Sequence, residues 1–317
     1  MSRVLAVVGA TGTGKSALAN ALAVHLGGEV ISADSMQVYR GMDIGTAKTP
    51  PAERTVPHHC LDLVDPGFPF TAALYQRAAR AAIESALERG AVPIVCGGTG
   101  LYIRAALDDF TLDEDRERES ADDKRENEGA HEASSGEPSG EPAAQRRLAD
   151  DNSTLGVSRQ RSASEKRSEL NRLADELGAE TFHALLAERD PESAALIHPH
   201  NVRRVVRAFE FLEQGASYAQ QHEGFATYSA VYPVTFLGIT VERALLYEVI
   251  NRRVDAMLSA GLLAEVQALL AAGFREGATA QQAIGYKELV PVLDGTRSQH
   301  DAIEEIKQST RHYAKRQ

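Results

Sequence analysis

Short apolar runs alternate with longer stretches of helical spacing in the first third of the chain. The strand-like runs occupy residues 4–8, 29–32 and 92–96. The spacing of apolar residues predicts helices over residues 15–26 and 71–89, and a third helix from Leu101. Strands that alternate with helices predict a parallel α/β sheet flanked by helices. In such sheets ligands bind at the carboxyl ends of the strands.

This alternation stops after about residue 112. The following segment is charged, rich in Ser, Glu, Pro and Gly, and nearly free of large apolar residues, which predicts a disordered insertion. Helical periodicity resumes at Leu170, a further helix is expected over 202–214, and strand character returns over 231–240. We therefore expect a core split into two parts, with a smaller helical domain inserted between them. The expected boundaries are 1–112 and 227–317 for the core, 113–166 for the insertion and 167–226 for the helical domain.

Composition narrows the class of protein. The chain has 317 residues, 43% of them hydrophobic and 25% charged, enough for one sizeable core and a second unit. No run approaches the roughly 20 apolar residues of a membrane span, so we expect a soluble, cytoplasmic protein. Cys60 and Cys96 lack the spacing of a metal knuckle and suit a reducing compartment. No apolar stripe is left over after the core is assigned, which favours a monomer.

The net charge of −11 does not exclude a nucleic-acid partner. Residues 113–142 hold twelve acidic and four basic residues, and this segment alone accounts for −8 of the total. The rest of the chain is therefore close to neutral, and local basic patches decide which partners it can bind.

A glycine-rich motif follows the first strand and opens the first helix. Its residues are Gly9, Ala10, Thr11, Gly12, Thr13, Gly14, Lys15 and Ser16. They match the P-loop pattern, in which backbone N–H groups converge on phosphate oxygens at a helix N-terminus. Lys15 supplies a positive charge for the phosphate, and Ser16 a hydroxyl suited to Mg²⁺. The motif predicts a polyphosphate site on a P-loop NTPase-like fold, but it does not name the reaction.

Two further polar residues follow strands. Asp34 comes after the second strand and could be a general base, a magnesium ligand or a turn-forming residue. Thr99 follows the third strand, where it could cap the next helix or face the substrate. Both positions belong to the same edge of the expected sheet as the P-loop.

Two basic clusters are open to more than one interpretation. Arg203, Arg204 and Arg207 share one expected helix, as either a solvated face or a phosphate-binding one. Lys307, Arg311 and Lys315 recur at four-residue steps, which suits a nucleic-acid backbone or an ordinary solvated face equally.

Several motifs together resemble one family, the bacterial tRNA dimethylallyltransferases, also called tRNA isopentenyltransferases. The segments that carry the resemblance run in family order over nearly the whole chain: GATGTGKS at 9–16, DSMQVYRGMDIGTAK at 34–48, PHH at 57–59, GGTGLY at 97–102, DPESAALIHPHNVRRVVRAFE at 190–210, QAIGYKEL at 282–289 and TRHYAKRQ at 310–317. The long second segment separates this family from generic P-loop kinases. The chain departs from the family pattern at His200-Asn201, where Asn-Asp is usual, and in its long acidic insertion. In the family pattern, TRHYAKRQ also continues into a Thr-Trp-Phe-Arg segment.

The resemblance implies transfer of a dimethylallyl group from dimethylallyl diphosphate to N6 of the adenosine 3′ of the anticodon in tRNA. The P-loop would then bind the diphosphate, with Lys15, Mg²⁺ on Ser16, and Arg207 offsetting the charge of the leaving group. Asp34 would take the proton from the amine, so the expected catalytic residues are Asp34, Thr99 and Lys15. The residues expected to contact tRNA are Asp34, Ser35, Met36, Gln37, Thr99, Arg167 and Arg203.

Three other functions fit part of the sequence. A small-molecule kinase would share the P-loop and could close an arginine-rich lid from the helix at 202–214. A nucleotide-binding switch would share the fold and act through partners. A relative that prenylates free AMP or ADP would share the chemistry, although the basic stripes and the C-terminal helices favour tRNA.

Overall fold

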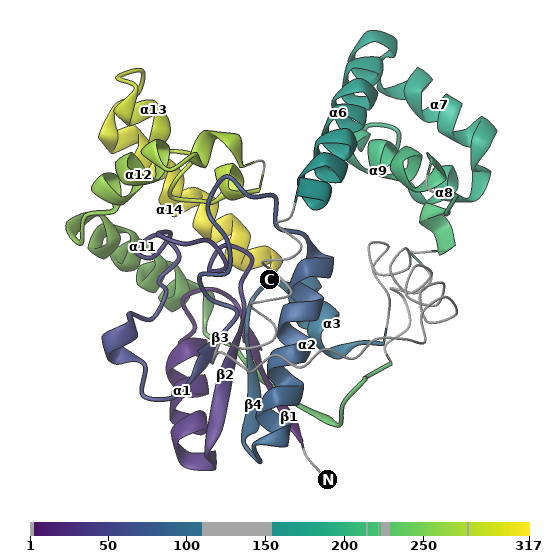
Figure 1. Cartoon of the computed structure of the whole chain (residues 1–317). Helices are drawn as coiled ribbons and strands as arrows, with labels where there is room; N and C mark the ends of the chain where they lie inside the picture. Colours follow the sequence, from purple (N-terminus) through teal and green to yellow (C-terminus); the bar gives the residue numbers. More distant parts are fainter. Residues whose placement is uncertain (1–2, 110–153, 214, 221, 223–228, 278) are drawn as a thin grey trace. The chain divides into compact units, whose positions relative to one another are not determined.

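The computed structural model describes residues 3–109, 154–213, 215–220, 222, 229–277 and 279–317. These residues divide into two compact units. The core unit holds residues 3–109 and 230–317, and the helical unit holds residues 154–229 (Figure 1). Most of the predicted insertion therefore lies outside the described residues.

The core unit begins as an α/β structure and ends in helices. Its first half contains β1 (Val4–Gly9), α1 (Lys15–Leu26), β2 (Gly28–Ala33), the 3₁₀ turn η1 (Pro51–Glu53), β3 (His58–His59), α2 (Ala72–Glu88), β4 (Val92–Gly97) and α3 (Gly100–Leu107). Its second half contains β5 (Val234–Ile239), α11 (Arg243–Ser259), α12 (Leu262–Ala271), η2 (Phe274–Glu276), η3 (Ala280–Gln282), α13 (Val290–Leu293) and α14 (Gln299–Arg316).

The described strands form one parallel sheet in the order β3-β2-β4-β1-β5. In its centre Leu5 lies opposite Ile94 on one side and Thr235 on the other. The prediction of a parallel α/β sheet is confirmed. Sequence periodicity missed the two-residue strand β3, which is too short to show alternation.

Helices cover the two faces of this sheet. Helix α1 packs on the face that presents Val7, Val30 and Ile94, and buries Ala19 and Ala23 against it. Helix α2 contacts β2 and β4 from the opposite side (Figure 1). The crossovers β1-α1-β2 and β3-α2-β4 run in opposite directions along the sheet, so right-handed connections place their helices on opposite faces.

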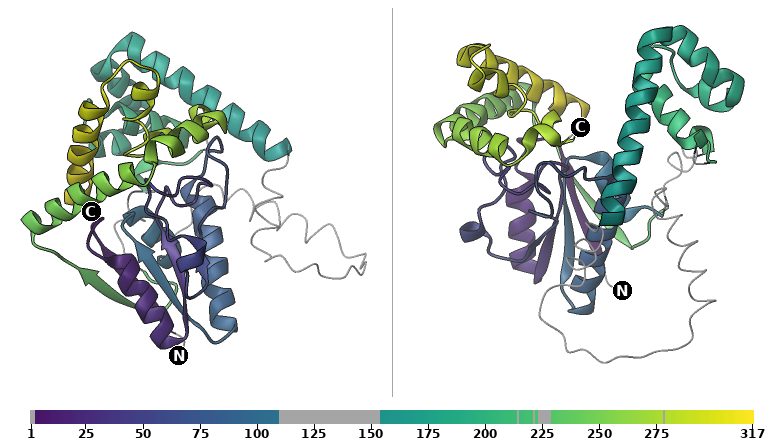
Figure 2. Two further views of the ribbon diagram at one scale, coloured as in Figure 1. Left: turned by 90° about the vertical axis from the view of Figure 1, so that its left-hand side faces the viewer. Right: turned by 45° about the horizontal axis from the view of Figure 1, so that its top comes forward.

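The C-terminal helices of the core unit lie beyond the carboxyl ends of the strands (Figures 1 and 2). Helix α11 packs against α14, and α12 contacts both α11 and α13. Among the described residues no single helix is long and apolar enough to cross a bilayer; α11 and α12 reach that length and composition only together, and they are bent by 63°.

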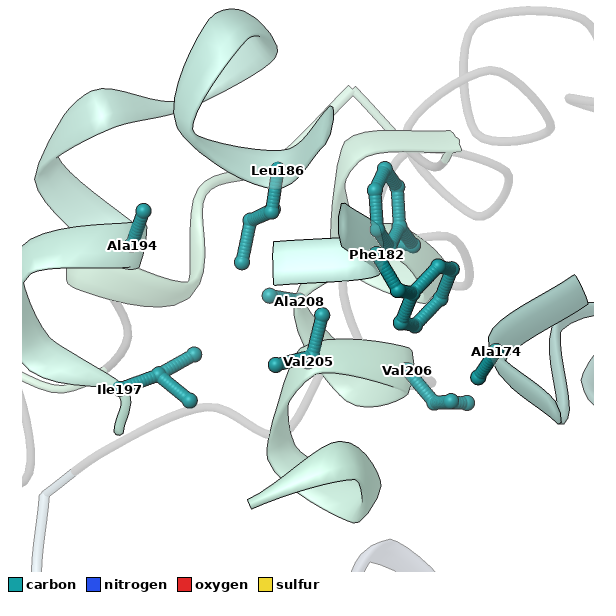
Figure 3. Packing of buried hydrophobic residues seen from close by; sticks show 9 residues of the cluster. Ala174, Phe182, Leu186, Ala194, Ile197, Val205, Val206 and Ala208 are labelled. Atoms are coloured by element: carbon teal, nitrogen blue, oxygen red, sulfur yellow. The ribbon is translucent and has the colours of Figure 1, made fainter. Parts of the chain in front are cut away.

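The helical unit has a core of its own. The longer helices among its described residues are α6 (Thr154–Leu177), α7 (Ala179–Arg189), α8 (Pro191–Leu196) and α9 (Val202–Glu213). The ring centroids of Phe182 and Phe209 lie 4.9 Å apart. Leu186, Val205 and Val206 are buried in the same cluster (Figure 3). Replacing a buried phenylalanine by alanine typically costs about 3–5 kcal/mol, so this cluster can hold the four helices together.

The start of α6 corrects one expectation. Disorder was predicted as far as residue 166, but the helix begins at Thr154. Residues 154–166 contain only two large apolar residues, Leu155 and Val157, so no apolar stripe marks the helix in the sequence. The remainder of the predicted insertion, residues 113–153, lies outside the described part of the chain.

Candidate functional site

The phosphate-loop motif forms a strand-to-helix turn that only glycine tolerates at key positions. Gly12 and Gly14 have φ values of 85° and 88°, in the left-handed region. At Gly9, with φ of 152°, an added Cβ would lie 2.6 Å from the Ile239 carbonyl oxygen of the neighbouring strand. Gly14 is the N-cap of α1 and has no side chain to occupy the N–H groups of the first turn. The helix N-terminus is therefore open to an anion.

Lys15 and Ser16 stand in the first turn of α1. The Lys15 Nζ donates a 2.7 Å hydrogen bond to the Ala10 carbonyl, within the loop itself. Burial lowers the pKa of Lys15, and nearby Cys96 and Asp34 oppose that shift. The Ser16 hydroxyl is hydrogen-bonded to the Cys96 thiol, whose pKa burial raises to about 11. Cys96 is therefore a buried, protonated thiol at neutral pH.

Asp34 directly follows β2 and is half-buried. Its Oδ1 accepts a hydrogen bond of 2.9 Å from the Met36 backbone N–H, so the residue does form the turn that the sequence allowed. Its charge nevertheless acts on Lys15 and on Arg253, where it opposes the burial that lowers the pKa of both. Among the described residues Oδ2 has no hydrogen-bond partner. Asp34 therefore combines a turn with a free carboxylate oxygen beside the phosphate loop.

Thr99 occupies the N-cap position of α3, but its side chain does not cap the helix. Its hydroxyl instead accepts from the Ser35 backbone N–H at 3.3 Å and is hydrogen-bonded to Tyr313 of α14. The capping interpretation of Thr99 is therefore wrong. Its hydroxyl joins the loop after β2 to the loop after β4.

Gln37 ends the recognition segment expected at 34–37. Its Oε1 accepts from the Ser32 hydroxyl at 2.8 Å, and its Nε2 donates to the Thr46 carbonyl at 3.1 Å. Ser35 and Met36 are, like Gln37, half-buried. The segment thus lies at the carboxyl end of β2, and both the oxygen and the nitrogen of the Gln37 amide are hydrogen-bonded.

Arg253 is a charged group of this site that sequence reasoning missed. It extends from α11, and its Nη1 donates to the Thr11 hydroxyl at 3.3 Å. Burial lowers its pKa, while Asp34 raises it. A signal was present in the sequence: Arg253 lies three and seven residues after Ile250 and Leu246, both buried, so it shares their helix face. A cation on a buried face needs an anionic partner.

Helix α14 also reaches the loops at the carboxyl edge. The side chain of Gln317 accepts from the Thr11 backbone N–H at 2.7 Å and donates to the Gly98 carbonyl at 2.9 Å. It thereby joins the phosphate loop to the loop after β4. The sequence left the basic stripe of this helix open between a nucleic-acid backbone and a solvated face, and gave no sign of a contact with the phosphate loop.

The basic stripe itself is largely engaged within the core unit. Lys307 pairs with Asp255 at 2.9 Å and with Glu304 at 3.1 Å, and its side chain is only 15% exposed. Arg311 donates to Asn251 at 2.7 Å. A phosphate-binding role is therefore wrong for Lys307, because α14 uses this face to pack on α11.

The other predicted arginines belong to the helical unit, not to the unit that holds the phosphate loop. Arg207 pairs with Glu210 at 3.1 Å, and its guanidinium lies 4.3 Å from the ring centroid of Phe211. Arg167 lies 3.5 Å from the same glutamate, and Arg203 is exposed. The assignment of Arg207 to the diphosphate stays a prediction, as do the tRNA contacts of Arg167 and Arg203.

The oxygen donors at the site suit a hard divalent cation. Ser16 offers a hydroxyl and Asp34 a carboxylate, both at the phosphate loop. No cluster of three or more His, Cys, Asp or Glu side chains within the described ranges could hold a metal alone. Such a donor set fits a cation that takes its other ligands from substrate phosphates and water, as Mg²⁺ commonly does.

Comparison with known proteins identifies the chain's relatives. A family model described as IPP transferase matches residues 37–154 and 146–317, and a second, isopentenyl transferase, matches residues 2–56. The chain belongs to the IPP transferase family. The resemblance drawn from the motifs is thereby confirmed, together with the P-loop fold class.

Curated relatives match nearly the whole of this IPP transferase chain. It is 43% identical over 317 residues to the tRNA dimethylallyltransferase of Geobacillus thermodenitrificans, a match that covers 99% of this chain and 86% of the relative. The tRNA dimethylallyltransferase of Bacillus subtilis is 39% identical over 315 residues, with the same coverage.

Solved structures show the same fold. The full-length tRNA isopentenylpyrophosphate transferase of Bacillus halodurans has a TM-score of 0.61 and 37% identity, and the match covers 100% of this chain and 86% of that one. A eukaryotic dimethylallyltransferase described as acting on tRNA has a TM-score of 0.70 and 28% identity, covering 100% and 69%.

Proposed function

We propose that this chain transfers a dimethylallyl group from dimethylallyl diphosphate to N6 of the adenosine 3′ of the anticodon in tRNA. One observation carries the proposal: in a member of the IPP transferase family, Asp34, Lys15 and Arg253 gather around an open phosphate loop. That arrangement provides a cationic site for a leaving diphosphate and a carboxylate for an incoming amine.

The diphosphate binds at the loop that joins β1 to α1. Backbone N–H groups of the loop and of the first turn of α1 donate hydrogen bonds to its oxygens. The Lys15 ammonium and the Arg253 guanidinium have only a carbonyl and a hydroxyl as described partners, at Ala10 and Thr11, and exchange these for phosphate oxygens. Negative charge grows on the diphosphate as the C–O bond breaks, so both cations stabilise the transition state more than the ground state.

The acceptor adenine leaves its stack and enters beside Asp34 and Thr99. The amine nitrogen forms the new bond to the dimethylallyl carbon while the bond from that carbon to the diphosphate oxygen breaks. The Asp34 carboxylate takes the proton released from N6, and diphosphate departs with the electron pair of the broken bond. An adenine amine is a weak nucleophile, so holding it in line with the carbon supplies much of the rate.

Ser16 would hold Mg²⁺ beside the diphosphate, and Asp34 is a second oxygen donor near the phosphate loop. When bound, it neutralises charge on the leaving diphosphate. Asp34 remains the proton acceptor, because its Oδ2 has no described hydrogen-bond partner.

In this proposal the helical unit binds the anticodon stem. Arg203 is exposed on α9, and Arg167 is exposed on α6. Arginines in such positions bind phosphates and set the register of the RNA without reading its sequence.

The test is transfer of labelled dimethylallyl group, from its diphosphate and with Mg²⁺, to unmodified tRNA and separately to AMP. We expect label in tRNA, and none when the adenosine 3′ of the anticodon is replaced by guanosine. Label in AMP alone would instead assign the chain to prenylation of free nucleotides.

A third part of the test measures the binding and turnover of ATP in the absence of RNA. Absence of label in both acceptors, together with ATP turnover without RNA, would overturn the proposal and favour a kinase. Slow or absent turnover with tight ATP binding would favour a nucleotide-dependent switch.

A further inference from the structure

The segment at 34–37 is tied to a second loop, residues 43–48, that follows it in the chain. The link is the Gln37 side chain, whose Nε2 donates to the Thr46 carbonyl at 3.1 Å. Its Oε1 is held from the other side by the Ser32 hydroxyl. The position of the Gln37 amide therefore depends on where the 43–48 loop lies.

A carboxylate from a distant helix holds that loop. Glu265 of α12 accepts from the backbone N–H groups of Ile44 at 2.8 Å and Gly45 at 3.2 Å. The Tyr286 hydroxyl donates a third hydrogen bond to it at 2.6 Å. Hydrogen bonds to an ionised carboxylate are about twice as strong as neutral ones, so this contact fixes the loop firmly.

The surroundings leave the loop little room to move. Tyr286 is fully buried, and a Cβ added at Gly45 would lie 2.4 Å from its ring. Burial and the Glu265 charge raise the pKa of Tyr286, so its hydroxyl stays protonated and remains a donor.

A second anchor lies at the far end of the same loop. The Lys48 side chain is 2% exposed, and its Nζ donates to the Tyr39 carbonyl at 2.9 Å, to Asp43 at 2.7 Å and to Asp62 at 2.6 Å. Lys48 secures the loop to residues nearby in the chain. Glu265 is the contact that sets its position against the C-terminal helices.

We propose that Glu265 is a positioning residue for the acceptor base, acting through the 43–48 loop on Gln37. The inference rests on the proposed function and on the tRNA contact that the family resemblance implies for residues 34–37. It assigns Glu265 to acceptor recognition and leaves the diphosphate site independent of it, because none of its contacts involves the phosphate loop.

The variant that tests this role is Glu265→Gln, which has nearly the same shape. Its amide keeps one acceptor oxygen and places an NH₂ group against the other donors. We expect the KM for tRNA to rise about tenfold, the cost of roughly one charge-assisted hydrogen bond. The affinity for inorganic diphosphate stays within about twofold of wild type, which shows that the fold and the phosphate loop are intact.

Tyr286→Phe is the matched control. It removes a hydrogen bond from the same carboxylate but leaves both bonds to the loop amides. We expect the KM for tRNA to change less than about threefold. An equal rise in both variants would mean that general loss of packing, not the hold on the loop, causes the effect, and would overturn the proposal.

A double-mutant cycle with Gln37→Ala tests whether Glu265 acts through Gln37. If Glu265 acts through Gln37, Glu265→Gln has little further effect on the KM for tRNA once Gln37 is alanine. Fully additive effects would show that Glu265 acts elsewhere and would contradict the inference.

Amide hydrogen exchange separates this inference from the proposed function. In Glu265→Gln we expect faster exchange over residues 34–48 and unchanged exchange over residues 9–16. Unchanged exchange over 34–48 overturns the inference even if wild type modifies tRNA. Faster exchange with a wild-type chain that transfers nothing to tRNA confirms the hold on the loop and refutes the assigned reaction instead.

Discussion

Strand β2 has a carboxylate at each end, and the two have opposite surroundings. Glu29, near its start, accepts hydrogen bonds from Arg89 at 2.7 and 3.1 Å and pairs with His59 at 2.6 Å. Asp34, directly after its end, accepts one hydrogen bond among the described residues, from the Met36 backbone. One strand thus places a paired carboxylate, Glu29, at one edge of the sheet. At the other edge it places Asp34, which has no ion-pair partner among the described residues.

The cations near the two carboxylates differ in the same way. Arg89 forms its ion pair with Glu29. The Asp34 charge acts on Lys15 and Arg253, yet among the described residues neither cation forms an ion pair with it. Lys15 donates to the Ala10 carbonyl and Arg253 to the Thr11 hydroxyl. Charges that neutralise one another stabilise the fold, whereas charges that lie close without pairing remain available to a substrate.

The largest expected effect comes from Asp34→Asn, which keeps the turn-forming oxygen but removes the proton acceptor. We expect the transfer rate to fall about 10²- to 10⁴-fold, the usual worth of a general base. Binding of inorganic diphosphate should stay nearly intact. Single-turnover transfer and calorimetric titration measure the two quantities.

A parallel loss of both quantities would contradict the role of Asp34 as base. It would place the carboxylate in the diphosphate site itself, where Lys15→Ala is expected to weaken binding and transfer together.

The next largest effect separates two arginines. Arg253→Ala should weaken binding of inorganic diphosphate about ten- to a hundredfold, because a hydrogen bond to a charged group contributes about 1.5–3 kcal/mol. Arg89→Ala, the matched control, should leave that affinity unchanged, since Arg89 forms its ion pair with Glu29 near the start of β2. Calorimetric titration of both variants against wild type measures the difference.

Arg207→Ala, measured beside them, tests the assignment made from the sequence. If Arg207→Ala weakens diphosphate binding and Arg253→Ala does not, the helical unit supplies the phosphate-binding arginine, and Arg253 only stabilises the Thr11 hydroxyl.

The sequence was most informative where one local pattern determines both structure and chemistry. The glycines at 9–16 specify a turn that few other residues could adopt, and the same turn presents N–H groups to phosphate. Asp34 and Thr99 were found because each follows a strand, and parallel strands bring their carboxyl ends to one edge. Their side-chain partners did not follow from that rule, and the hydroxyl of Thr99 contacts Ser35 instead of capping its helix.

Residues that reach the site from distant helices were not predictable. Periodicity shows which face of α11 or α14 is buried, but not which loop that face meets. Arg253 and Gln317 approach the phosphate loop from the C-terminal helices, and Glu265 lies 221 residues from the loop amide that it binds. The arginines of α9 stood out because they cluster, although a solvated helix face produces the same cluster.

The smallest expected effect concerns the other end of β2. Burial alone would raise the pKa of Glu29, but hydrogen bonds from Arg89 and His59 outweigh it and hold the pKa below the ordinary 4.5. A carboxylate with a lowered pKa stabilises the folded state above its ordinary pKa, and that stabilisation is lost as the pH falls through the folded-state value. Glu29→Gln should therefore lower the free energy of unfolding by about 1 kcal/mol at neutral pH. The difference from wild type, measured by urea unfolding, should shrink below pH 4.5, whereas a difference independent of pH would mean that packing, not charge, holds this end of the strand.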